Sequence, residues 1–484
     1  MLLSQDPYRP ELHFTAPFGW LNDPNGLVFV DGEWHLFYQY YPYGNKWNDM
    51  HWGHAVSRDL TNWKHLPIAL KPNELGVCFS GSAVIDHNNT SGFFKDGDLN
   101  LVAFYTNTMG LSPNQADGLQ MNSVASSTDG ITFDQHVAIN PIIPNTGLKN
   151  FRDPKVFWHE ESQRWVMVLT EGEEVGIYNS ENLTEWTRVS GWGKGEAYTD
   201  GGPFECPDLF SIVDDKGVTR WVMVMGTIFQ SYTEGSGTQY VIGDFDGKTF
   251  TRVDDHPDVL WMDYGKDFYA TQSWSNTPNN RNVAIAWMSN WLYSNDVPAT
   301  SHRSAMSFPR ELALVTTSQG LRMAQTFASD GMVATDNCAE LWGRVVKSNE
   351  TVTLSDPELA SMIDLELTLD NQTEILLSPL GSEALQYRIK KADKGYQVTM
   401  SRQRMVDGDE RYQQNFACEY NLELADNETL SLSIVRDRTS CEIIYNDGTV
   451  STTDCAFTHS FGEFNLEVLQ GNAVINTIKE SVKG

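Results

Sequence analysis

The sequence predicts an all-β protein with a five-bladed β-propeller at residues 1–320, a linker at 321–335 and a β-sandwich at 336–484. Three observations predict this fold. Short apolar and aromatic runs alternate with Gly, Asn and Asp turns along the whole chain, and amphipathic helical stretches are scarce. A pattern of strand, turn and strand recurs five times in the first two-thirds of the chain. After about residue 320 that pattern stops.

Each repeat consists of an apolar strand, a turn and a second strand that often begins with Trp. The clearest copies open at Asp23, Asp153 and Glu205, and looser copies open at Phe79 and Asp267. A second signature, a polar turn that ends in Trp or Phe, marks the outer part of several repeats, at residues 57–63, 127–133, 180–186 and 246–250. Five units of roughly four strands each are typical of a five-bladed propeller.

The last third of the chain has a different pattern. Trp becomes rare after Asp336, and polar and apolar residues alternate at 363–367 and 430–435. Hairpin turns such as the one at 446–448 separate these strands. The pattern indicates a β-sandwich, joined to the propeller by a linker with a little helix. We expect the sandwich to stabilise the molecule or to form a wall of the substrate site, and it could mediate a homodimer.

Composition excludes several classes of partner. The length of 484 residues exceeds what a single core usually supports, so two domains are expected. The net charge of −30 disfavours nucleic acid and anionic membranes, which leaves a neutral substrate as the best fit. No apolar run is long enough to span a membrane. No signal peptide follows Met1, so we expect a cytoplasmic protein if Met1 is the native start and a secreted one if the N-terminus was processed.

The six cysteines predict no metal site. They lie at scattered positions without the C-x-x-C spacing of metal clusters, and their spacing assigns no disulfides. Cys206 directly follows an acidic residue of one repeat, but no His accompanies it as a base. We therefore interpret Cys206 as a small packed residue and not as a nucleophile.

Three carboxylates carry the functional signal. When the repeats are aligned, Asp23, Asp153 and Glu205 take the same position, just before the innermost strand of three units, and each is followed within two residues by Pro. Any single Asp-Pro is an ordinary turn. In a propeller, however, that shared position points to one end of the central channel. We therefore expect the three carboxylates to converge in one funnel, with the prolines fixing the local backbone.

Converging carboxylates repel one another, so a protein keeps them for metal binding or for acid–base chemistry. Calcium sites typically recruit about six to eight oxygens, often from dense acidic loops, and no such loop lies near these acids. Glycoside hydrolysis needs one carboxylic acid and one carboxylate on opposite sides of the bond. A funnel rimmed with Trp and Tyr also suits a sugar. The pattern favours a glycosidase that needs no cofactor and no metal.

The motifs that carry these acids resemble those of glycoside hydrolase family 32, the invertase, inulinase and levanase group. Residues 20–26, WLNDPNG, resemble the family signature W-M-N-D-P-N-G, with Leu21 where Met is usual. Residues 151–154 resemble its F-R-D-P motif, and 205–207 its E-C-P motif. Residues 79–82 are similar to its F-S-G-S segment, and 437–440 to a segment of its C-terminal sandwich. The resemblance runs through nearly the whole chain.

The resemblance implies a retaining exo-β-fructosidase that hydrolyses terminal non-reducing β-D-fructofuranosyl residues of fructans and sucrose. It assigns Asp23 as the nucleophile, Glu205 as the acid/base and Asp153 as the transition-state stabiliser. The same resemblance implies a set of residues around the terminal fructose: Asn22, Gln39, Trp47, Phe79, Ser80, Arg152 and Trp291. Trp47 and Trp291 could stack on sugar faces or belong to the core.

Three alternatives stay open at this point. The same scaffold could transfer fructose to another sugar instead of water, because acceptor binding decides that balance. An arabinan-type five-bladed hydrolase also carries three carboxylates but inverts, although residues 22–26 argue against it. A sugar-binding propeller without catalysis is the non-enzymatic alternative, and the presence of all three acids disfavours it. The preference among sucrose, β-2,1 and β-2,6 fructans is not decided by the sequence.

Overall fold

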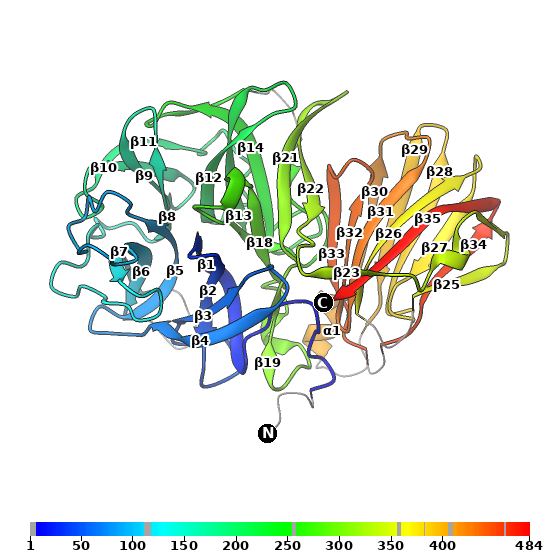
Figure 1. Ribbon diagram of the computed structural model, residues 1–484, viewed down its shortest axis with the longest axis horizontal. Coiled ribbons are helices and arrows are strands. Elements are labelled where there is room, and N and C mark those ends of the chain that lie inside the picture. The colour runs from blue at the N-terminus through cyan, green and yellow to red at the C-terminus, as the bar shows by residue number, and fades with distance from the viewer. Residues whose placement is uncertain are drawn as a thin grey trace.

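The structure is a computed structural model that describes residues 6–110, 118–253, 258–355, 360–381, 383–404, 410–458 and 461–484. Two β-rich lobes lie side by side (Figure 1). The strands from β1 to β22 form one lobe, and those from β23 to β35 form the other. The one α-helix among the described residues is α1 (Glu410–Phe416). In that part of the chain, no helix has the length and apolar character needed to cross a membrane.

The first lobe contains five sheets, which are the blades of a propeller. The first blade comprises β19 (His302–Arg303), β1 (Gly19–Val30), β2 (Glu33–Tyr41), β3 (His51–Ser57) and β4 (Trp63–Leu70). The second comprises β5 (Val77–Ile85), β6 (Leu101–Met109) and β7 (Leu119–Ser127). The third comprises β8 (Phe151–His159), β9 (Arg164–Glu171), β10 (Val175–Ser180) and β11 (Thr187–Trp192).

The fourth blade comprises β12 (Glu205–Val213), β13 (Thr219–Thr227), β14 (Gly237–Phe245), β15 (Phe250–Arg252) and β16 (Leu260–Trp261). The fifth comprises β17 (Tyr269–Ser273), β18 (Val283–Met288), β20 (Ala305–Met306), β21 (Arg310–Thr317) and β22 (Gly320–Phe327). Short 3-10 turns lie at η2 (Pro278–Asn280), η3 (Ser294–Asp296) and η4 (Ala339–Leu341).

The blades close into a ring. Their innermost strands contact one another in the cyclic order β1, β5, β8, β12, β17 and back to β1. At the closing seam, the Ser275 N–H donates to Leu27 O and the Phe29 N–H donates to Ser275 O, both at 3.0 Å. Strand β19 adds a second link, because it returns late in the chain to pair in parallel with β1. The predicted all-β, five-bladed propeller is confirmed.

The second lobe is the predicted β-sandwich. One sheet comprises β23 (Met332–Thr335), β24 (Arg344–Lys347), β26 (Ser361–Leu369), β31 (Leu430–Asp437), β32 (Ser440–Tyr445), β33 (Val450–Cys455) and β35 (Asn472–Lys483). The other comprises β25 (Thr351–Ser355), β27 (Glu374–Ser378), β28 (Leu385–Ala392), β29 (Gly395–Arg402), β30 (Cys418–Leu424) and β34 (Phe464–Gln470). Their inner faces share one apolar core.

The stretch expected to be a linker, residues 321–335, belongs mostly to sheets. Strand β22 pairs with β21 in the fifth blade, and β23 pairs with β35 in the sandwich. Strand β22 contains Arg, Met, Ala and Gln, which favour helix locally. Its pairing with β21 across a tight turn decides the conformation instead. We therefore propose that the boundary between the domains lies at 328–331.

The outer signature of the repeats forms one recurring turn. In four blades an Asp or Asn side-chain Oδ1 accepts two backbone N–H groups, at distances of 2.7 to 3.1 Å. These residues are Asp59, Asp129, Asn182 and Asp246. Such turns satisfy the backbone where the chain reverses into the outer edge of a blade. The repeat detected in the sequence is therefore a repeat of turn chemistry.

Candidate active site

All five innermost strands carry a β-bulge at the same level of the channel. In each, two residues face one residue of the neighbouring strand. The bulges lie between Leu21 and Pro24, Cys78 and Gly81, Arg152 and Lys155, Glu205 and Asp208, and Tyr269 and Gln272. A regular strand points successive side chains to opposite faces. The bulges break this alternation, so neighbouring residues can reach the same channel end.

The bulges correct one detail of the sequence alignment. The three acids were expected at one shared position ahead of the strands, but they lie inside the strands and at three successive positions. Glu205 precedes its bulge, Asp153 is the first bulged residue, and Asp23 is the second. The alignment matched acids and prolines, whereas strand pairing sets the true register.

Three of the bulges place their first residue in a strained backbone conformation. Asp153 has φ of 64°, Cys206 has φ of 47° and Ala270 has φ of 54°, all in the left-handed region that side chains rarely adopt. Strain of this kind persists where the surrounding structure fixes it, and it clusters at functional sites. Here it turns Asp153 toward the channel end.

A cavity of about 500 Å³ opens at this end of the channel. All ten residues predicted from the sequence line it: Asn22, Asp23, Gln39, Trp47, Phe79, Ser80, Arg152, Asp153, Glu205 and Trp291. They come from blades one to four and from the loop after β18. Four further lining residues escaped prediction: Lys46, Ile228, Asn295 and Asp296. These four lie on connecting segments without a repeated motif, so no pattern marks them.

Asp23 lies between two donors. The Ser80 hydroxyl donates to Asp23 Oδ2 at 2.6 Å, and the Cys206 thiol lies 3.5 Å from the same oxygen. Burial raises the pKa of Asp23, and the charge of Glu205 raises it further, while the Ser80 hydrogen bond lowers it. Ser80 therefore favours the ionised form of Asp23, which a nucleophile needs.

Asp153 is buried and held through its backbone. Its N–H donates to Thr106 Oγ1 at 3.0 Å, and its Oδ2 accepts the Cys206 N–H at 2.9 Å. Burial raises the pKa of Asp153 to about 7, against the lowering effect of the Arg152 guanidinium. The charges of Glu205 and Asp23 act in the same direction as burial. The three carboxylates are thus close enough to influence one another electrostatically.

Glu205 has a donor at each oxygen. Arg152 donates to Oε1 at 2.7 Å, and the Tyr269 hydroxyl donates to Oε2 at 2.5 Å. Arg152 is itself fixed by Asn150 Oδ1 at 2.9 Å, and its Nε lies 3.7 Å from Asp153. Burial lowers the pKa of Arg152, but the carboxylates of Glu205 and Asp153 outweigh it and raise the pKa. Arg152 therefore stays charged between two acids.

Cys206 is a packed thiol, in line with its interpretation from the sequence. Its side chain is buried, and its Sγ lies 3.7 Å from Asp153 Oδ2 as well as near Asp23. Burial raises the pKa of Cys206 well above its ordinary value, and the three neighbouring carboxylates raise it further. A thiol that stays protonated is a poor nucleophile.

The aromatic and amide side chains form the cavity wall. Trp291 stacks on Trp20 with ring centroids 5.9 Å apart, and Trp47 meets Phe79 edge to face at 5.9 Å. Trp47 and Trp291 each pack against the core and also line the cavity. Stacking of either ring on a sugar stays a prediction. Among the amides, Asn22 Oδ1 accepts the Trp20 indole N–H at 2.7 Å. This hydrogen bond orients the Asn22 side chain.

The arrangement is suited to acid–base chemistry on a neutral polar molecule. It joins three neighbouring carboxylates, one shared arginine, three amides and three aromatic rings in one cavity. Within the described residues, no group of three or more His, Cys, Asp or Glu side chains is placed to hold a metal ion. All six cysteines are free thiols in the structure.

Comparison with known proteins identifies the family. The model of the glycosyl hydrolases family 32 N-terminal domain matches residues 13–325. A levanase of Bacillus subtilis (strain 168) is 40% identical over 93% of this chain, which spans 66% of that levanase. The chain belongs to glycosyl hydrolase family 32. It is therefore a glycoside hydrolase, as the resemblance of its motifs implied.

Other members of family 32 resemble this chain over their greater part. An extracellular exo-inulinase of Aspergillus awamori is 36% identical over 94% of this chain and 90% of its own length. Its crystal structure matches with a TM-score of 0.87 at 34% identity, covering 99% of this chain and 98% of that one. A fructofuranosidase of Schwanniomyces occidentalis, solved in complex with fructosylnystose, matches with a TM-score of 0.85 at 29% identity over 99% and 98% of the two chains. These family 32 structures share the propeller and sandwich seen here.

Proposed function

We propose that this family 32 hydrolase is an exo-acting β-fructosidase. It releases terminal non-reducing fructose from fructans and sucrose, with retention of configuration. The observation that carries the proposal is the convergence of Asp23, Asp153 and Glu205 in one cavity. The names of the relatives, levanase, exo-inulinase and fructofuranosidase, support fructosides as the substrate class.

In the first step, the Asp23 carboxylate attacks C2 of the terminal fructose. Glu205 gives its proton to the glycosidic oxygen as the C2–O bond breaks, so the leaving sugar departs neutral. In the second step, the Glu205 carboxylate takes a proton from water. The resulting hydroxide bonds to C2 and releases Asp23. Asp153 holds fructose hydroxyls and stabilises the positive charge that develops at C2.

The contacts around the acids support these roles. Ser80 holds the pKa of Asp23 below the value that burial alone would give, which favours the ionised nucleophile. Arg152 and Tyr269 fix both oxygens of Glu205, which limits the directions in which its proton can be delivered. The side chains of Asn22 and Gln39 lie on the same wall and can accept or donate to neighbouring hydroxyls.

The replacement of Glu205 tests the hydrolase assignment. Glu205→Gln keeps the shape of the side chain but removes its acid function. We expect kcat/KM to fall by about 100-fold or more on sucrose, inulin and levan. Glu340→Gln, an exposed sandwich position, is the matched control and should leave activity unchanged. Undiminished turnover by Glu205→Gln, with circular dichroism unchanged, would rule out the assignment.

The first-formed product tests the mechanism. Proton NMR during early turnover should show β-fructofuranose before mutarotation, because two displacements retain configuration. The α-anomer as first product would instead indicate the inverting, arabinan-type chemistry.

Oligosaccharides that accumulate at high sucrose concentration would indicate transfer to a sugar acceptor. Sugar binding without turnover would indicate the non-catalytic alternative. Initial rates on sucrose, inulin and levan, measured side by side, give the linkage preference.

A homodimer through the sandwich remains a prediction. Sedimentation velocity over a range of concentrations tests it directly.

A further inference from the structure

The loop at residues 228–236 connects β13 to β14 in the fourth blade and borders the cavity at the channel end. Ile228 lines the cavity, and the next residue, Phe229, leaves 55% of its surface exposed. A single exposed apolar residue is common on protein surfaces and means nothing by itself. What distinguishes Phe229 is the way its loop is held and the side of the cavity on which it lies.

The start of the loop is fixed to the segment that precedes Glu205. Asp200 Oδ2 accepts the backbone N–H groups of Phe229 at 2.6 Å and of Gln230 at 3.1 Å. The Tyr198 hydroxyl donates to Gln230 O at 2.9 Å. Phe229 therefore has a defined backbone position despite its exposure.

The end of the loop is fixed to the segment that carries Trp291. Asn290 Nδ2 donates to Glu234 O at 3.3 Å and to Ser236 O at 3.4 Å. The Ser236 hydroxyl accepts the Trp291 N–H at 3.2 Å. Because Trp291 lines the cavity, the loop and the cavity wall form one hydrogen-bonded unit.

The sandwich supports the middle of the same loop. The Tyr232 hydroxyl donates to the backbone oxygen of Asn421 in β30 at 2.6 Å. The buried Lys266 ammonium donates to the backbone oxygens of Thr233 and Glu234. An aromatic ring on a loop with this many anchors has little conformational entropy left to lose on binding.

The ring of Phe229 lies beside the backbone segment that leads into Glu205. A methyl group on Gly202 would come within 2.8 Å of the Phe229 ring, so the ring covers the backbone at Gly202. Gly202 lies three residues before Glu205, and Glu205 pairs with Gly226 at the end of the strand that leads into the loop. In the proposed mechanism Glu205 protonates the leaving oxygen. The leaving sugar therefore departs along this side.

The geometry points to Phe229 as a binding platform for part of the leaving sugar chain. The first leaving unit is the one bonded directly to the terminal fructose, and Phe229 binds the units that follow it. This inference rests on the proposed function. The C–H face of a sugar stacks on an aromatic ring, and the acidic surface does not oppose a neutral fructan. Ile228 lines the cavity whereas Phe229 lies outside its wall, so the first leaving unit meets Ile228 and later units meet Phe229. Sucrose has only one leaving unit, so Phe229 favours fructans over sucrose.

The test is the ratio of kcat/KM on inulin or levan to kcat/KM on sucrose. Phe229→Ala should lower this ratio about fivefold to tenfold, because it removes the stacking surface. Phe229→Tyr keeps the ring and should restore most of the ratio. Gly202→Ala should lower the ratio as well, because its methyl group displaces the ring from its place.

The control is Trp342→Ala, which removes a 58% exposed ring from the sandwich and should leave the ratio unchanged. A ratio unchanged in Phe229→Ala, or one that Phe229→Tyr fails to restore, would overturn the inference. Failure of the proposed function has a different signature, because the wild-type enzyme would then hydrolyse neither sucrose nor fructan.

Discussion

At the scale of single residues, the site consists of buried acids held by a small number of donors. Arg152 joins Glu205 and Asp153, and Cys206 joins Asp153 and Asp23 through its backbone and thiol. Asp23 and Asp153 therefore depend on their neighbours for their charge. Burial raises the pKa of Asp23 and Asp153, and only the local donors oppose it.

Ser80→Ala should shift the acid limb of the kcat/KM profile to higher pH. The Ser80 hydrogen bond lowers the pKa of Asp23, so its loss raises that pKa and protonates the nucleophile at pH values where it was ionised. At the optimum we expect a loss of about tenfold in kcat/KM, since a hydrogen bond to a charged group is lost. A pH–rate profile measures both effects.

Ser82→Ala provides the matched control on the same strand. Ser82 is buried, and its hydroxyl donates to Pro154 O at 2.8 Å, not to a carboxylate. Its loss should lower stability but leave the acid limb in place. An acid limb that stays fixed in Ser80→Ala would contradict the role given to Ser80.

At the scale of elements, the five bulges bring residues from distant segments to one end of the channel. Every innermost strand has its bulge at the same level, and four of those strands supply lining residues of the cavity. The close packing of the bulges leaves no room for side chains at some positions. A Cβ on Gly81 would lie 1.9 Å from Phe104 O in the neighbouring strand.

Gly81→Ala should destabilise the second blade and displace Ser80 beside it. We expect a loss of roughly 1–3 kcal/mol in the free energy of unfolding, because the added methyl group meets backbone that cannot move away. Activity should fall as well. Gly32→Ala is the comparison, since nothing lies within 4 Å of that Cβ and only its φ of 80° opposes the change. Gly32→Ala should cost about 1 kcal/mol and leave activity intact. Denaturant unfolding of both variants tests this, and equal costs would contradict it.

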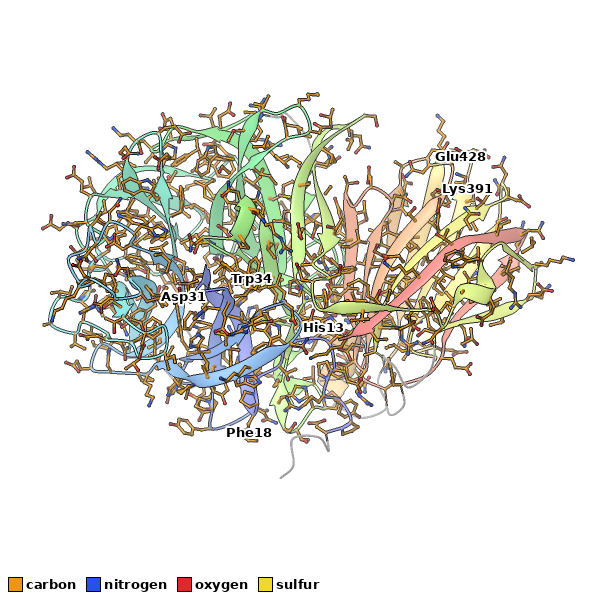
Figure 2. All side chains as sticks on the ribbon, in the orientation of Figure 1. His13, Phe18, Asp31, Trp34, Lys391 and Glu428 are labelled. Atoms are coloured by element: carbon orange, nitrogen blue, oxygen red, sulfur yellow. The ribbon has the colours of Figure 1, made fainter. Side chains whose placement is uncertain are left out.

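At the scale of the whole molecule, buried charges join the propeller to the sandwich. Arg310 of the fifth blade pairs with Asp263 at 2.9 Å and with Glu442 of the sandwich. His13, which Figure 2 places between the two lobes, lies 2.9 Å from Asp437 and 2.8 Å from Glu442. Among the described residues, the sandwich contributes no side chain to the cavity. Its influence on the site passes through this interface and through the loop at 228–236.

His13 should make the stability of the enzyme depend on alkaline pH. Burial alone would lower the pKa of His13, but hydrogen bonds and charge from Asp437 and Glu442 raise it to about 9. Because the pKa of His13 is raised on folding, the charged His13 stabilises the folded protein fully below about pH 6.5, and this stabilisation is lost as the pH rises through 9. His13→Gln should cost roughly 3–5 kcal/mol at pH 6, where it removes a buried charge partner.

Thermal unfolding between pH 6 and pH 10 measures this dependence. The difference between wild type and His13→Gln should shrink as the pH rises through 9. His87→Gln, at an exposed position, should show almost no difference at any pH. A constant difference for His13→Gln over the whole range would show that His13 does not carry the charge.

All ten residues predicted from the sequence line one cavity, because each lies in or near a repeated or family motif. Four lining residues were missed because they lie on connecting segments, where no repeated motif marks a position: Lys46, Ile228, Asn295 and Asp296. The strand at 320–327 was missed for another reason. Its residues favour helix, and hairpin pairing with the preceding strand β21 overrides that preference.

The sequence by itself determined the two all-β domains, the number of blades, and the identity of the three acids, because alternation, turns and motifs are local patterns. Only the tertiary structure decided how those acids relate to one another. Bulges set their register, burial and neighbouring donors set the charge of Asp23 and Asp153, and a loop supported by the sandwich borders the leaving side. These properties depend on which segments meet in space, and contacts between distant segments leave no periodic trace in the sequence.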